Sequence, residues 1–320
     1  MRFLNLMNAL RWRGNPITKL GKFYFILIIM KIIVVSISFP VYLHIARDLE
    51  LAVQTGNLAY VGIALNFLGY LLVLGTTVFL ASLIIESYLY INAWGYSKMK
   101  EIGLVGISYG SAIMFLVIGY LILIGSYFNE AQCLLEQIPP PQSLIANEIV
   151  ALFLIGIGSI PLFLGVIILV IVLSRISFTY DIEEAQMALF MVIIQMILNF
   201  AGGMIRITSP LAAYARGIFE VILGIVSVVT NLYLYRTFIK LGSIYDEVKK
   251  NPELLNRSLE EISESVSPIK LKDFARNKRI PYEWLISRLK EEMDNGRISG
   301  HIINDIFYPA QQRDSNEKQK

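Results

Sequence analysis

Long apolar stretches separated by short polar segments occupy most of the first 250 residues. Six of them approach or exceed the roughly 20 residues that a helix needs to cross the hydrocarbon core of a bilayer. They cover residues 23–46, 58–85, 102–127, 144–173, 186–206 and 211–238. The pattern predicts an all-α polytopic membrane protein, with six transmembrane helices in residues 22–250. The last helix is expected to continue as a stalk to about Asn251.

Residues 1–21 and 311–320 flank this organisation. The first segment is apolar on one side and basic at its end, which suits a helix lying in the headgroup region of the cytoplasmic side. A frayed terminus is the alternative. Residues 311–320 are polar throughout, and we expect a disordered tail.

Residues 251–310 show shorter periodic patterns, as in a small soluble domain. Asn251 and Pro252 mark a helix start. An apolar helical stripe follows at Leu255, Leu259, Ile262 and Val266. A second helix is expected over 271–278 after a brief strand entry, and a third from about residue 281 to a cap at Asn295–Gly296.

The end of this domain predicts a β-hairpin. Residues 297–303 alternate in polarity, Asn304–Asp305 suits a tight turn, and 306–308 returns as a second strand. The domain is therefore expected to be α+β, with three helices followed by two strands.

Three helices and a two-stranded wing resemble a winged helix. The segment Ile269-Lys-Leu-Lys-Asp-Phe-Ala, the Ile280-Pro step, Leu285 with Leu289, and Asn295-Gly-Arg-Ile-Ser-Gly resemble the winged helices of PCI-type and ESCRT-III-associated proteins. The resemblance covers residues 252–309, under a fifth of the chain, and supports a fold better than a function. Lys278 stands where that family usually has Leu, so the second helix is expected to be short.

The distribution of positive charge predicts the orientation in the membrane. The N-terminal segment and the second and fourth loops carry Lys or Arg, whereas residues 128–143 carry none. Arg206 and Arg216 flank the last outer loop and oppose this trend. The majority places both termini in the cytoplasm and Cys133 outside, in a cell membrane.

Composition agrees with a membrane protein and narrows the chemistry. The chain is 55% hydrophobic and 17% charged, against about 25% charged in a soluble domain. One cysteine excludes an internal disulfide, and two distant histidines, His44 and His301, cannot form a His-rich metal site. Ser108 lies in a G-x-S-x-G match inside an apolar run without a suitable histidine partner. We therefore expect no enzyme, no cofactor and no metal.

Two charged residues lie deep within the apolar stretches and are candidates for an intramembrane role. Lys31 lies about nine residues into the first stretch, and Glu220 lies deep in the last. Intramembrane charges are costly and often functional. The alternatives are snorkelling of Lys31 towards the headgroups and a local pair of Glu220 with Arg216, four residues earlier.

The fourth stretch contains a run of small residues around Gly158 and Pro161. Such a run can break a helix and expose backbone carbonyls to a substrate, as in transporters. Close packing of neighbouring helices with a simple proline kink is the alternative, and it is favoured because no second interrupted stretch matches this one.

Charge also separates the faces of the C-terminal domain. Its second helix and flanks are basic, which suits anionic lipid headgroups or an ordinary solvated face. These basic residues are Lys270, Lys272, Arg276, Lys278 and Arg279. Its third helix is mainly acidic, so nucleic acid is an unfavourable partner for the usual reading helix.

Trp284 is the most conspicuous exposed candidate. It projects onto the charged face of the third helix beside Arg288 and Glu291. Trp and Arg are enriched in binding hot spots. We expect Trp284 to bury against a partner protein, a second copy of the chain, or the inner ends of the spans.

Three functions follow from these features. The leading hypothesis is a membrane adaptor that presents its winged helix to a cytoplasmic protein. The second is a transporter or channel with a regulatory winged helix, using Lys31, Glu220 and the break at 158–161. The third is a membrane-tethered DNA-binding regulator. A polar cavity among the spans, reaching Lys31 or Glu220, would favour the second hypothesis over the first.

Overall fold

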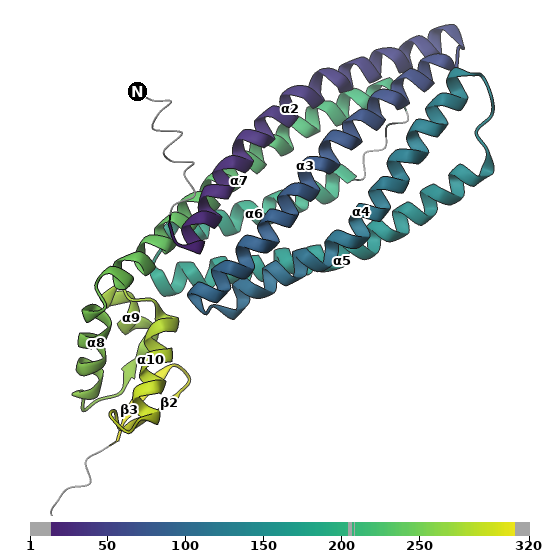
Figure 1. The fold of residues 1–320 in the computed structure, drawn as a ribbon. Helices are drawn as coiled ribbons and strands as arrows, with labels where there is room; N and C mark the ends of the chain where they lie inside the picture. Colours follow the sequence, from purple (N-terminus) through teal and green to yellow (C-terminus); the bar gives the residue numbers. More distant parts are fainter. Residues whose placement is uncertain (1–13, 204–206, 208, 311–320) are drawn as a thin grey trace, which may run out of the picture.

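The computed structural model describes residues 14–203, 207 and 209–310 of the chain. The expected N-terminal interfacial helix, the C-terminal tail and Arg206 lie outside these residues. Six long helices form an elongated bundle, and a small α+β unit lies at one end of it (Figure 1). The bundle helices are α2 (Pro16–Thr55), α3 (Ala59–Ser97), α4 (Lys100–Leu135), α5 (Gln142–Tyr180), α6 (Glu183–Gly203) and α7 (Pro210–Lys250).

Within the described residues, six helices are long and apolar enough to cross a membrane, as the sequence predicted. They extend beyond the apolar stretches, because polar residues at their ends remain helical. The helix α2 begins at Pro16 because the Asn15 side chain accepts a hydrogen bond from the Thr18 backbone N–H at 2.8 Å. The expected continuation of the last span is also confirmed, since α7 is one helix from Pro210 to Lys250.

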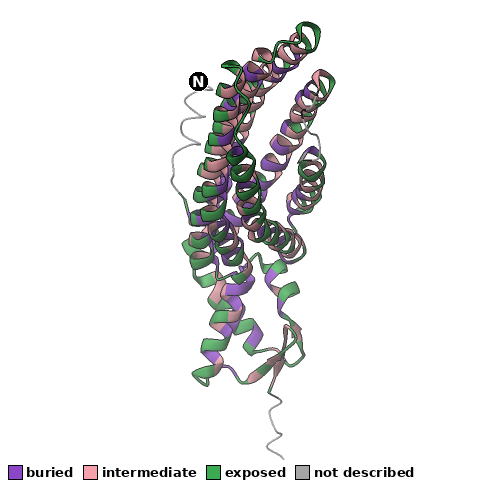
Figure 2. Cartoon of the chain, turned by 90° about the vertical axis from the view of Figure 1, so that its right-hand side faces the viewer, coloured by how far each residue is buried: buried purple, intermediate pink, exposed green. Residues whose placement is uncertain are grey.

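The outer faces of the bundle are apolar and exposed (Figure 2). Only 17–33% of the most apolar 18-residue window in each helix is buried inside the protein. Exposed side chains on these faces include Phe153, Phe178, Phe200 and Leu211. So much apolar surface is unfavourable in water, and it fits an integral membrane protein.

The six helices close a ring in chain order. Each packs against the next along the chain, and α7 returns to pack against α2. Small residues allow close approach: a Cβ added to Gly106 on α4 would lie 2.8 Å from the Ser87 carbonyl oxygen on α3. The Ser87 hydroxyl donates to the Gly106 carbonyl at 2.7 Å across the same contact.

The helix α5 runs unbroken through Pro161. Gly158 lies against α4, where an added Cβ would be 2.9 Å from Leu116 Cγ, whereas Gly156 has nothing within 4 Å. The packing interpretation of this small-residue run is confirmed for Gly158. The helix break that a transporter would use here is absent, since α5 is one continuous helix that packs along α4.

The C-terminal unit contains three helices and a three-stranded antiparallel sheet. Its elements are α8 (Glu253–Ser263), β1 (Ile269–Lys270), α9 (Leu271–Lys278), α10 (Tyr282–Asp294), β2 (Gly300–Ile303) and β3 (Ile306–Pro309). The strand order is β1-β3-β2, with Ile269 opposite Phe307 and Ile302 also opposite Phe307. The hairpin turn has positive φ at both Asn304 and Asp305, as a tight two-residue turn requires. The expected short second helix and the strand entry are both present.

Two expectations for this unit were wrong. Val266 does not extend the apolar stripe of α8, because the helix ends at Ser263 and a turn leaves Val266 96% exposed. Strand β2 begins at Gly300 rather than at residue 297. The apolar core of the unit also includes Val248, which is 2% exposed and belongs to the last turn of α7. The stalk therefore contributes to the core that it supports.

Candidate functional site

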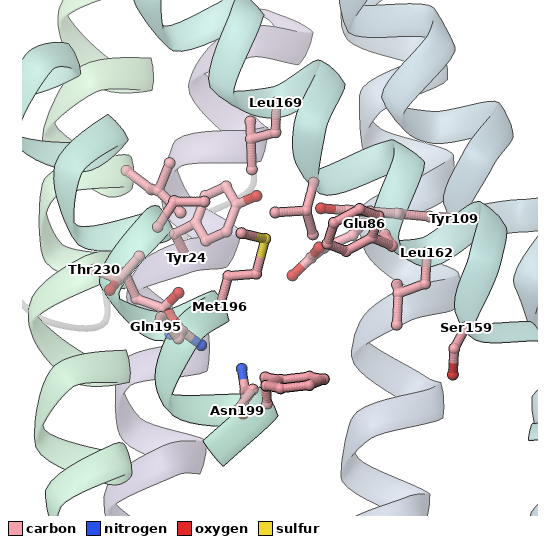
Figure 3. Close-up of a pocket in the computed structure, with 16 residues that line it drawn as sticks. Tyr24, Glu86, Tyr109, Ser159, Leu162, Leu169, Gln195, Met196, Asn199 and Thr230 are labelled. Carbon is pink, nitrogen blue, oxygen red and sulfur yellow. The ribbon is translucent and has the colours of Figure 1, made fainter. Parts of the chain in front are cut away.

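A cavity of about 460 Å³ lies within the bundle, and all six helices line it (Figure 3). This volume falls in the range of pockets that hold small organic ligands, about 300–1,000 Å³. Its polar lining comprises Tyr24, Glu86, Tyr109, Ser159, Gln195, Asn199, Thr230 and Asn231. The rest is apolar, with Phe163, Leu169 and Phe200 among the contributors. Such a lining combines a few polar groups with a large apolar surface.

Glu86 supplies the only carboxylate of this lining. It lies on α3 eleven residues before Ser97, where the helix ends, which is about 16 Å along the helix axis. Glu86 and Tyr109 lie on one side of the cavity, and Gln195 and Thr230 lie on the other (Figure 3). Among the described residues Glu86 has no hydrogen-bond or ion-pair partner. A half-buried carboxylate within an apolar bundle is costly without such a partner, which makes Glu86 a candidate functional group.

Neighbouring polar groups of the cavity are held by local contacts. The Tyr24 and Tyr90 hydroxyls are 2.6 Å apart. Gln195 Nε2 donates to the Ser227 hydroxyl at 3.3 Å, and the Thr230 hydroxyl donates to the Val226 carbonyl at 2.8 Å. These contacts fix part of the wall, whereas the Glu86 carboxylate takes part in none of them.

Lys31 and Glu220, the charges expected within the membrane, do not line this cavity. Lys31 lines an apolar groove between α2 and α7, beside Val35 and Gly224. It acts electrostatically on both Glu86 and Glu220, but it forms no ion pair with either among the described residues.

Glu220 and Arg216 form a local pair, as the alternative interpretation proposed. Their side chains are 2.5 Å apart on successive turns of α7, and Arg216 also donates to the Gly202 carbonyl. The pair lines a second cavity of about 230 Å³ with Ser38 and Thr76. A polar cavity therefore reaches Glu220, while a larger one reaches Glu86.

A second polar cluster joins the C-terminal unit to the bundle, and Glu283 is its centre. Glu283 lies in the first turn of α10, and its side chain is 7% exposed. It forms an ion pair with Arg175 of α5 at 2.9 Å and accepts a hydrogen bond from Tyr245 of α7 at 3.0 Å. Tyr180 of α5 also donates to it. Every partner lies on a bundle helix, so this carboxylate fixes the unit in place.

Trp284 lies beside this cluster. Its indole packs edge-on against Tyr245, with ring centroids 5.0 Å apart, and against Tyr96 at 5.6 Å. The indole N–H donates to the Tyr96 carbonyl at 3.2 Å. Three surfaces were expected to contact Trp284, and in the structure it packs against one of them, the ends of the membrane spans. Contact with the bundle leaves Trp284 partly exposed, and its assignment to a partner-binding surface stays a prediction.

The other two residues of that expected surface remain on the outside. Arg288 and Glu291 pair with each other at 2.7 Å on one face of α10, and both are exposed. Arg288 also lines a polar groove of about 370 Å³ between α8 and α10, with Glu260 and Glu292.

The basic residues around α9 are partly neutralised within the unit. Lys272 pairs with Asp305 at 2.5 Å, Arg276 with Asp273 at 3.1 Å, and Lys278 with Glu261 at 2.6 Å. Lys270 and Arg279 are exposed, with no salt bridge among the described residues. The net positive charge of this face is therefore smaller than the number of its Lys and Arg residues would indicate.

Tyr282 extends the cluster towards the sheet. Its hydroxyl donates to the Asp305 carboxylate, and burial together with this hydrogen bond raises the pKa of Tyr282. Partial burial alone would raise the pKa of Asp305, but the hydrogen bonds from Lys272 and Tyr282 leave that pKa below its usual value. Asp305 is thus held as a charged carboxylate at the hairpin turn.

Sequence reasoning missed Glu86 and Glu283. The second apolar stretch was drawn to residue 85, which leaves Glu86 just beyond its end, whereas α3 continues to Ser97. The signal that could have found it is its spacing: Glu86 lies twelve residues before Lys98, too far to be a helix end. Glu283 was one of the acidic residues that make the expected third helix mainly acidic, and no local pattern distinguishes it.

No group of three His, Cys, Asp or Glu side chains suited to a metal ion is found in the part of the chain that the structure describes. Comparisons of the chain with protein-family models, curated proteins and solved structures gave no match. The functional argument therefore depends on the geometry of the cavity and the cluster.

Proposed function

We propose that this chain is an integral membrane transporter or channel whose C-terminal unit is a cytoplasmic regulatory domain. The observation that carries the proposal is the cavity of about 460 Å³ to which all six helices contribute, with the unpaired Glu86 carboxylate in its wall. A ring of helices around a mainly apolar cavity with a few polar groups is the usual way in which bundles build ligand sites. An adaptor needs no such cavity.

The same proposal includes the orientation of the chain. Lys98, Lys100 and Arg175 lie at the ends of α3, α4 and α5 that are next to the C-terminal unit. Positive residues favour the cytoplasmic side, which supports a cytoplasmic location for both termini.

We also retain the winged-helix interpretation of the C-terminal unit as part of the proposal. The order helix, strand, helix, helix, hairpin and the strand order β1-β3-β2 support it. The Glu283 cluster supports a regulatory role, because it connects α10 to the ends of α3, α5 and α7. DNA reading by α10 is disfavoured, since its first turn packs against the bundle.

A membrane adaptor is the second candidate, and one observation favours it. The polar groove between α8 and α10 is lined by Arg288 and Glu292, and it includes no residue of the Glu283 cluster. A cytoplasmic peptide could occupy it while the unit stays attached to the bundle. This role is compatible with transport, but it leaves the Glu86 cavity unexplained.

Water access to the cavity tests the proposed function. Cys133 is first replaced by Ser, since it is the only native cysteine. Gln195→Cys then places a thiol in the cavity wall, and Ile197→Cys places one on the 58%-exposed outer face of the same helix. In purified protein in lipid nanodiscs, a water-soluble thiol reagent that cannot enter lipid should modify position 195 at least about tenfold faster than position 197. Equal and slow modification at both positions would contradict the proposal.

A further inference from the structure

We infer that the cavity binds a monovalent organic cation, an amine or quaternary ammonium group on an apolar body, with Glu86 as its counter-ion. This inference deepens the proposed function and rests on it. It follows from the charge, the shape and the chemistry of the cavity wall, taken in turn.

The charge of the cavity is set by one residue. Glu86 is the only carboxyl side chain among the described residues of the lining, which include no Lys, Arg or His. Arg216 and Glu220, the other charged pair among the spans, neutralise each other in the second cavity. Lys31 attracts Glu86 from outside the lining without pairing with it. A cationic group inside the cavity would supply the direct partner that Glu86 lacks among the described residues.

The wall favours an organic cation over a metal ion. A metal ion would need several oxygen ligands in one place, but the described residues contain no group of three acidic or metal-binding side chains. The wall instead offers aromatic rings and aliphatic groups around one carboxylate. Tyr24, Tyr109, Phe163 and Phe200 are the aromatic residues of the lining. Aromatic rings stabilise cations over their faces, and apolar surface accommodates the body of the ligand.

The entrance to the cavity suits an amphiphilic ligand. Ser159 and Phe163 of α5 and Asn199 and Phe200 of α6 line the cavity and are exposed on the outside of the bundle. The opening therefore lies between α5 and α6, where neighbouring faces are apolar. A cation with an aromatic or alkyl body could pass these apolar faces, and Ser159 and Asn199 supply polar groups at the same opening.

Protection from modification tests this inference. The purified full-length Cys133→Ser/Gln195→Cys protein is treated with N-ethylmaleimide, a neutral reagent, in the presence of one of three probes. These are benzyltrimethylammonium, benzyl alcohol and benzenesulfonate, which share a benzene ring and differ in charge. We expect half-protection by the cation at a concentration at least about tenfold lower than by either of the others.

Variants of the carboxylates assign the effect. Glu86→Gln should remove the preference for the cation, Glu86→Asp should retain it, and Glu220→Gln is the matched control that should also retain it. A preference that persists in Glu86→Gln, or its loss in Glu220→Gln alone, would overturn the inference. If Glu86→Gln does not fold, the comparison of cation with anion in the parent protein still decides, because no other Asp or Glu and no Lys, Arg or His lines the cavity among the described residues.

The outcomes also separate this inference from the proposed function. Equal protection by all three probes would leave a ligand cavity and overturn only the assignment of its ligand. A thiol at position 195 that N-ethylmaleimide never modifies would remove the accessible cavity, and both proposals would fail.

Discussion

Glu283 shows how one side chain can connect two parts of a molecule. A glutamate in the first turn of a helix normally faces solvent, where it interacts favourably with the helix dipole. Here three bundle side chains, Arg175, Tyr180 and Tyr245, satisfy it in a site that is largely buried. Removing one partner of a buried ion pair costs more than the pair itself contributes, because a charge is left uncompensated.

Glu283→Gln should therefore loosen the C-terminal unit. We expect a loss of about 2–3 kcal/mol in the free energy that holds the unit on the bundle, below the range for fully buried pairs because Arg175 is partly exposed. The measurement is the rate at which a protease cleaves between α7 and α8 under native conditions. Glu291→Gln, which removes an exposed pair on the same helix, should leave that rate unchanged. Equal cleavage of both variants would argue against a docking role for Glu283.

Asp305 should give the C-terminal unit a pH-dependent stability. Its pKa is lower in the folded protein than the value of about 3.9 in an unfolded chain. The carboxylate therefore stabilises the fold fully above that value, and this contribution is lost as the pH falls through the folded pKa. Asp305→Asn should reduce the acid sensitivity of thermal unfolding below about pH 4. Asp273→Asn is the matched control, and the same reduction in both variants would exclude a specific role for Asp305.

At the scale of the elements, the sequence predicted helix number and type better than helix length. The six apolar stretches, the continuous α7 and the order of the C-terminal elements were all visible in periodicity and in turn residues. Hydropathy delimits the apolar part of a helix, however, and α3 continues for twelve residues after its apolar stretch. For this reason Glu86 was placed at a helix end.

Tertiary contacts account for the other differences. Val248 belongs to the core of the C-terminal unit, although local periodicity assigns it to the stalk. Trp284 was identified correctly as a residue that needs a partner, but only the folded chain shows that Tyr96 and Tyr245 provide it. Their separation from Trp284 in sequence leaves no local pattern that could reveal the contact.

The contact between α4 and α5 predicts opposite effects at two neighbouring glycines. Gly158→Ala places a Cβ 2.9 Å from Leu116, so overpacking should cost about 1–3 kcal/mol. Gly156→Ala meets nothing within 4 Å, and it should be neutral or stabilising by up to about 1 kcal/mol, because alanine favours the helix. Thermal unfolding of the two variants in the same detergent is the measurement. A larger loss for Gly156→Ala would contradict the packing described for α5.

At the scale of the whole molecule, the proposal combines a membrane bundle with a cytoplasmic unit held on its end. Cys133 reports the orientation, because it lies near the end of α4 that is distant from the C-terminal unit and is half-buried. A membrane-impermeant thiol reagent should label it in right-side-out vesicles. Labelling only after lysis would reverse the proposed orientation.

The two cavities within the ring of helices distinguish a transporter or channel from an adaptor by the access that each needs to the interior of the bundle. A transporter or channel must expose its ligand site to both sides of the membrane, whereas an adaptor has no reason to expose the interior of its bundle to either. The cavity at Glu86 lies towards the C-terminal unit, and the one at Glu220 lies towards the opposite end. We expect a ligand or a water-soluble reagent to reach the interior of the bundle through these two cavities.

Two-sided access to position 195 is the most direct measurement of this account. The Cys133→Ser/Gln195→Cys and Cys133→Ser/Ile197→Cys proteins are compared in right-side-out and in inside-out vesicles, with a reagent that cannot cross the membrane. The account predicts modification at position 195 from both sides and at position 197 from neither. Modification of position 195 from one side only, or from neither side, would contradict it.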